Sequence, residues 1–168
     1  MSFNVENLFV RCDDQASVAE VVDRYWRSPS QAAQLDWGLP ASFEALLAGE
    51  PRRKVAISRS RDGWVALVES KEVVDFSLAR LLSEELDTAV LAIQLSETSG
   101  AAGYAYAVGG RVRESQFSYQ DSEPLSSVRR ALGRYNVPFD VTMFREAVQT
   151  FSEGWRVIQK GGSQRERS

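Results

Sequence analysis

The order in which hydrophobic periodicity changes along residues 3–95 constrains the fold of this chain more than any other sequence feature. Apolar residues recur first at every second position, then at helical spacing, then in two short alternating runs, then at helical spacing again, and finally in one apolar run. Alternation indicates a strand, whereas a repeat of three to four residues indicates a helix. The order therefore predicts strand, helix, strand, strand, helix and strand, as in a mixed α+β domain.

The first strand is expected over residues 7–12, followed directly by a helix. The apolar residues that alternate on one face of this strand are Leu8, Val10 and Cys12. Phe3 and Val5 are out of phase with them, which predicts a bend or bulge near Glu6. The pair Asp13-Asp14 then offers N-cap oxygens to a helix that continues until Ser28-Pro29.

A hairpin, a second helix and a further strand are expected over residues 54–96. The pair Asp62-Gly63 separates alternating runs at 54–60 and 64–69 and is a strong signal for a two-residue hairpin turn. Asp75 can cap the second helix. The second hairpin run and the run Thr88–Ser96 are apolar on both faces, so both are expected to be interior strands.

The rest of the chain predicts two more strands and two C-terminal helices. The strands are expected over Gly103–Val108 and Arg111–Tyr119, and the helices over residues 125–133 and 141–151. Charges on the last of these strands suit the edge of a sheet. The predicted fold is thus α+β, a ferredoxin-like βαββαβ core extended by two antiparallel strands, with C-terminal helices and the sheet order 2-3-1-4-5-6.

The length of 168 residues suits one domain, expected over residues 1–159. Trp155, Val157 and Ile158 are expected to form a segment that docks on this domain. Residues 160–168 contain no apolar side chain and predict a flexible tail.

Composition removes several classes of function. The chain has no histidine, so it lacks an imidazole base or ligand, and no catalytic, cofactor or metal site is predicted. Its single cysteine, Cys12, excludes an internal disulfide and fits a cytoplasmic location. The first residues show no secretory signal, and no run is long enough to span a membrane. A net charge of −3 argues against a protein built mainly to hold nucleic acid.

Two fragments are similar to the RNA-recognition motif, a family in which strand aromatics stack on bases. Leu8-Phe9-Val10 resembles its first-strand motif, and the segment from Asp62 to Glu69 resembles its third-strand octamer. Of the three aromatic positions in that octamer only Trp64 is aromatic, because Ala66 and Glu69 occupy the others. RNA binding is therefore kept as the less favoured interpretation, and core packing of these aromatics as the favoured one.

The unusually long connection over residues 28–53 suggests a partner surface. It carries Leu35, Trp37 and Leu39, and an acidic region follows the hairpin; the partner-binding candidates are Leu35, Trp37, Leu39, Glu69, Glu72, Glu84 and Glu85. The expected function is a non-catalytic module that binds another protein, as an adaptor, an inhibitor or an immunity protein does. The alternative is a small-ligand-binding or enzymatic domain that uses carboxylates with Tyr104 and Tyr106 at the sheet.

Overall fold

The computed structural model describes residues 4–27, 54–69, 76–96, 99–140, 156–159 and 165–166. This part of the chain is a mixed α+β fold with one antiparallel sheet and three helices. The elements in chain order are β1 (Asn4–Arg11), α1 (Gln15–Arg27), β2 (Lys54–Ile57), β3 (Trp64–Glu69), α4 (Phe76–Glu85), β4 (Ala89–Ser96), β5 (Ala101–Val108), β6 (Arg111–Ser118), α5 (Pro124–Arg134), β7 (Arg156–Gln159) and β8 (Arg165–Glu166).

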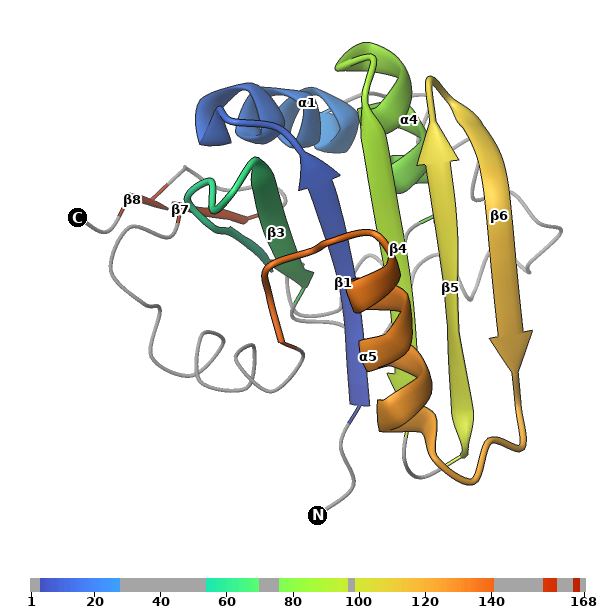
Figure 1. Cartoon of the computed structure of the whole chain (residues 1–168). Coiled ribbons are helices and arrows are strands. Elements are labelled where there is room, and N and C mark those ends of the chain that lie inside the picture. The colour runs from blue at the N-terminus through green and yellow to red at the C-terminus, as the bar shows by residue number, and fades with distance from the viewer. Residues whose placement is uncertain are drawn as a thin grey trace, which may run out of the picture.

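The sheet has the strand order β6-β5-β4-β1-β3-β2-β7-β8, and every neighbouring pair is antiparallel (Figure 1). The first six strands follow the order that the sequence predicts, with β3 and β4 in interior positions and β6 at an edge. The other expected edge is different, because β7 pairs with β2, Val55 lying opposite Ile158. The segment expected only to dock is therefore a strand, and Arg165–Glu166, within the expected tail, pairs with it as β8.

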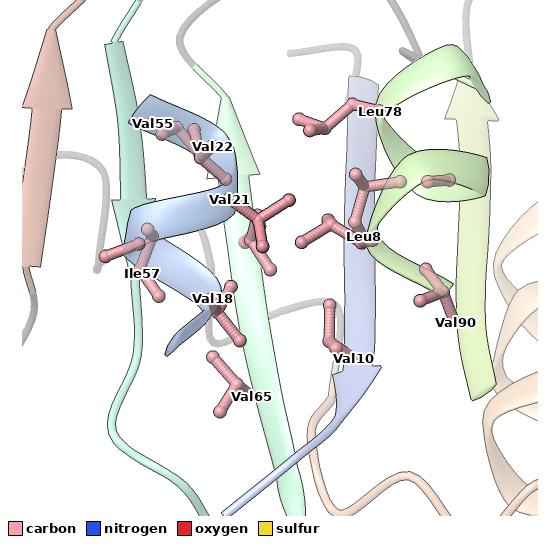
Figure 2. Packing of buried hydrophobic residues seen from close by; sticks show 14 of the residues in the cluster. Leu8, Val10, Val18, Val21, Val22, Val55, Ile57, Val65, Leu78 and Val90 are labelled. Atoms are coloured by element: carbon pink, nitrogen blue, oxygen red, sulfur yellow. The ribbon is translucent and has the colours of Figure 1, made fainter. Parts of the chain in front are cut away.

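One face of the sheet packs against α1 and α4. Figure 2 shows valines of α1 over β2 and β3, with α4 beside β1 and β4. Leu8 and Val10 of β1 belong to this layer and are buried. Burying one such side chain contributes about 1.5–3 kcal/mol, so the layer holds both helices to the sheet.

The opposite face packs against α5. Phe9 of β1, Trp64 of β3 and Leu91 of β4 are buried there with Val128 and Leu132 of α5. This confirms one C-terminal helix on the second face. The second, expected over residues 141–151, lies outside the described residues, as do the connection over 28–53 and the predicted cap Asp75.

Of the predicted bend or bulge near Glu6, a bulge in the pairing of β1 with β4 is wrong. Strand β1 pairs with β4 without interruption from Asn4 opposite Ser96 to Val10 opposite Val90. Along β1, position 5 is in phase with Phe9, whereas Leu8 and Val10 occupy the alternating positions. Residues 7–10 of this strand are buried on both faces, so two apolar patterns interleave along it and look like a phase change.

Local signals at the turns give the expected geometry. Asp62 and Gly63 both have positive φ, 48° and 82°, and Arg61 and Trp64 exchange two backbone hydrogen bonds across the turn. Asp14 caps α1, its carboxylate accepting from the Ala16 amide at 3.0 Å. The first hairpin strand ends at Ile57, earlier than predicted. At the next residue the Ser58 hydroxyl, and not a backbone carbonyl, accepts the hydrogen bond from the Ala66 amide.

Candidate functional site

The residues predicted to bind a partner do not form one site within the described part of the chain. Leu35, Trp37, Leu39 and Glu72 lie outside the described residues, and Glu69 is the last residue of β3. Glu84 and Glu85 are exposed on α4. Glu85 is engaged, since its Oε2 accepts from Nη2 of Arg24 at 2.7 Å, and an exposed pair of this kind contributes about 0–1 kcal/mol.

Exposed apolar side chains gather instead along β6. The large hydrophobic residues that are exposed in the described part are Phe76 at 44%, Val112 at 57%, Phe117 at 39% and Tyr119 at 75%. Three of them lie on β6 or directly after it. The fourth, Phe76 at the start of α4, contacts Phe117 edge to face, with ring centroids 5.7 Å apart. All four therefore lie along β6 or beside it at the start of α4, and we call this region the β6 edge surface.

The backbone of β6 adds polar groups to this surface. In the described part of the chain β6 pairs with β5 alone and forms one end of the sheet. Alternate N–H and C=O groups of such a strand point away from its neighbour and are open to another strand. Arg111 and Arg113 lie on the same strand, are exposed, and form no ion pair with any described residue.

A β-bulge determines which side chains of β6 share a face. Glu114 lies opposite Tyr106 and Val112 opposite Ala107, so Arg113 is an extra residue in the pairing. In a regular strand Val112 and Phe117 would point to opposite faces, because they are five residues apart. The extra residue restores the phase and places both on the face that α4 covers, where Phe117 meets Phe76.

The α5 face beside β6 carries a closed polar cluster centred on Glu114. Tyr104 donates to Oε1 of Glu114 at 2.6 Å, and Tyr135 donates to Oε2 at 2.7 Å. Arg134 completes an ion pair with Oε1 at 2.5 Å. Tyr135 also stacks on Tyr106, with ring centroids 4.1 Å apart. The cluster fastens the end of α5 to β5 and β6.

These contacts set the protonation of the cluster. The hydrogen bond from Tyr104 is the main cause that lowers the pKa of Glu114, and the same bond raises the pKa of Tyr104. Burial, followed by the hydrogen bond to Glu114, raises the pKa of Tyr135. At neutral pH the carboxylate is charged and both phenols are protonated. The O–H groups of both tyrosines are donated to Glu114, which also forms an ion pair with Arg134.

Cys12 lines an open cavity of about 460 Å³ at the end of β1 that meets the hairpin turn. Its other lining residues include Arg11, Asp13 and Asp62, of both charge signs. The Cys12 sulfur is occupied locally, accepting from the Asp14 amide at 3.4 Å. The described residues hold no group of three or more Cys, Asp or Glu side chains that could bind a metal ion.

The two aromatics behind the resemblance to the RNA-recognition motif are buried. Phe9 is fully buried and stacks on Phe139, with ring centroids 5.9 Å apart, and Trp64 belongs to the same apolar cluster under α5. Neither ring is accessible to a base. The structure thus favours core packing for both.

No family model, no curated protein and no solved structure matches this chain. Among the described helices, none has the length and apolar character that crossing a membrane requires. Any functional conclusion therefore rests on the geometry of the chain itself.

Proposed function

We propose that this protein is a non-catalytic protein-binding module, of the adaptor, inhibitor or immunity type, and that it binds through the β6 edge surface. The observation that carries the proposal is the distribution of exposed apolar residues: in the described part, every large one lies on this single edge. Scattered exposed residues need no explanation, but apolar residues gathered along one strand with open backbone groups are typical of an interaction site.

The proposal includes a ferredoxin-like core and a cytoplasmic location. The order β4-β1-β3-β2 with antiparallel pairing throughout supports the core assignment. The single cysteine supports a reducing compartment.

The residues predicted from sequence remain part of the proposal as a second contact region. If Trp37 anchors the partner, Trp37→Ala should weaken binding by roughly thirtyfold, since an anchoring tryptophan contributes about 2 kcal/mol or more. The melting temperature of the Trp37→Ala variant should stay unchanged. Reversing Glu69, Glu72, Glu84 and Glu85 to lysine should change mainly the association rate and its salt dependence. A Trp37→Ala protein that melts early and binds normally would remove the connection from the proposal.

A photo-cross-linking residue placed at Val112 tests the β6 edge surface directly. The matched control carries the same residue at Glu20, an exposed position on α1, which lies over β2 and β3 and so is several strands away from β6. We expect a specific protein adduct from position 112 that position 20 does not give, and we expect Phe117→Ser to abolish it. Adducts that are equal at both positions would contradict the proposal.

The enzymatic alternative has one observation in its favour. Tyr104 and Arg134 line a cavity of about 150 Å³ between α5 and the β5–β6 pair, beside the Glu114 cluster. Ligand sites usually enclose about 300–1,000 Å³, and the groups of this cluster already satisfy one another. Binding of a small molecule that is lost in Tyr104→Phe and kept in Phe117→Ser would favour this alternative.

A further inference from the structure

We infer that the partner contributes an extended segment that pairs antiparallel with the outer edge of β6, with apolar side chains on the α4 face and acidic side chains beside Arg111 and Arg113. This inference rests on the proposed function and specifies the partner's chemistry. It combines three properties that β6 has within the described part of the chain: open backbone groups, an apolar face, and arginines without an ion-pair partner.

The backbone determines the shape of the occupant. Eight residues of β6 form an edge with no neighbour among the described strands, and only another extended segment can satisfy a row of alternating donors and acceptors. Every existing pair in this sheet is antiparallel, and continuing that pattern keeps the same twist. A helix or a flat surface would leave these groups to water.

The α4 face determines where the segment is apolar. Val112 lies opposite Ala107 and Phe117 opposite Gly103, so the two side chains are four pairing positions apart on the same face, roughly 13 Å. Phe76 lies beside the second of them. A segment that covers this distance needs apolar side chains at alternate positions over about five residues.

The arginines at the start of β6 determine the charge expected on the neighbouring part of the partner. Arg111 and Arg113 have no ion-pair partner in the described part of the chain, and Arg80 approaches the same end, donating to the Gly110 carbonyl at 2.9 Å. Glu84 packs near Gly110 and forms no ion pair with them. Acidic residues of the partner would complement this group.

The same charges disfavour a second copy of this chain as the occupant. The acidic residue of β6, Glu114, is engaged by Tyr104, Tyr135 and Arg134. Paired antiparallel, a second β6 strand would bring its Ser118 end beside Arg111 and Arg113, and its acidic residue, Glu114, is not free to meet them.

Synthetic peptides test this inference on the full chain by fluorescence anisotropy. The probe has eight residues, with valine at alternate positions, threonine between them and two glutamates at its C-terminal end, opposite Arg111 in an antiparallel pair. A matched probe replaces both glutamates with lysine. We expect the lysine probe to bind about tenfold more weakly, and the double variant Arg111→Glu/Arg113→Glu to reverse this preference. The control variant Arg59→Glu, at an exposed position after β2 and several strands away from β6, should leave the preference for the glutamate probe unchanged.

Two further probes are N-methylated, each on one of the two sets of alternating residues. Because only alternate N–H groups of an added strand face its neighbour, one of these probes should lose binding and the other should keep it. Equal affinity for both N-methylated probes, or equal affinity for the glutamate and lysine probes, would overturn the inference.

The results separate this inference from the proposed function. If position 112 cross-links a protein partner but no peptide binds, the protein-binding proposal stands and the acidic extended segment is wrong. If sedimentation shows a dimer that Val112→Ser dissolves, the occupant is a second copy and the inference is again wrong. If neither cross-linking nor peptide binding is observed, both fail.

Discussion

Gly103 on β5 lies directly opposite Phe117 of the β6 edge surface, and an alanine in its place should destabilise the protein. An added Cβ at this position would lie 2.5 Å from the backbone oxygen of Gln116 and 2.7 Å from Cγ of Phe117. Ordinary contacts begin at 3.4 Å, so the carbonyl would have to move by about 0.9 Å, the difference between 3.4 and 2.5. Phe117 can turn toward solvent, but Gln116 is held in the β5–β6 ladder.

We therefore expect Gly103→Ala to lower the free energy of unfolding by about 2–3 kcal/mol, the upper part of the usual range for overpacking. With a urea m-value of about 2 kcal/mol/M, the midpoint of urea denaturation would fall by about 1–1.5 M. The matched control is Gly133→Ala in α5, where an added Cβ meets nothing within 4 Å. Alanine is the better helix former, so this variant should gain about 0.5–1 kcal/mol.

A double variant locates the source of the strain. Adding Phe117→Ala to Gly103→Ala removes the ring but leaves the Gln116 carbonyl in place, so stability should recover only in part. Full recovery would assign the clash to the ring alone. A Gly103→Ala protein with the wild-type midpoint would refute the close packing of β6 on β5 and with it the described position of Phe117.

Buried Trp64, buried Ser83 and the paired carboxylate of Glu114 each make a contribution to stability that can be measured. Trp64→Ala should cost about 3–5 kcal/mol in urea denaturation followed by circular dichroism, because this indole is buried in the core under α5. Ser83→Ala should cost about 1–3 kcal/mol by the same assay, because the buried Ser83 hydroxyl accepts from the Gly110 amide at 3.0 Å, which would lose its partner. The lowered pKa of Glu114 adds stability that is complete above its ordinary value of 4.5 and is lost as pH falls through the lowered one. Because Tyr104→Phe removes the main cause of that shift, the stability difference between wild type and variant should shrink as the pH falls below 4.5, the ordinary pKa of the carboxyl; a difference that stays constant with pH would contradict this assignment.

Much of the fold could be predicted because several signals are local. A strand that is apolar on both faces, such as β4, must be interior, and Asp62-Gly63 supplies the positive φ values that a two-residue turn requires. Strand β7 could not be predicted in the same way, because four residues with Val157 and Ile158 adjacent show no period. Its partner is also distant along the chain, so the pairing depends on long-range packing.

The candidate surface was predictable only in part. Charges on residues 111–119 correctly predicted the position of β6 at one end of the described sheet. The apolar face was missed, because strict alternation assigns Val112 and Phe117 to opposite faces. The bulge at Arg113 reverses that assignment, and no glycine or other turn residue in β6 signals it.

The bulge and the arginines of β6 also bear on why this edge stays available to a partner. Bulges and charges are devices by which proteins protect sheet edges from unwanted pairing. Here the bulge gathers Val112 and Phe117 on one face, which strengthens the surface it would be expected to interrupt. The arginines repel strands that bring positive charge to this end of β6, and a second copy of β6 brings no free carboxylate to it, because Glu114 is held by Tyr104 and Tyr135. Protection and recognition then have the same physical origin: the charges that exclude most strands favour one that carries acidic residues at its end.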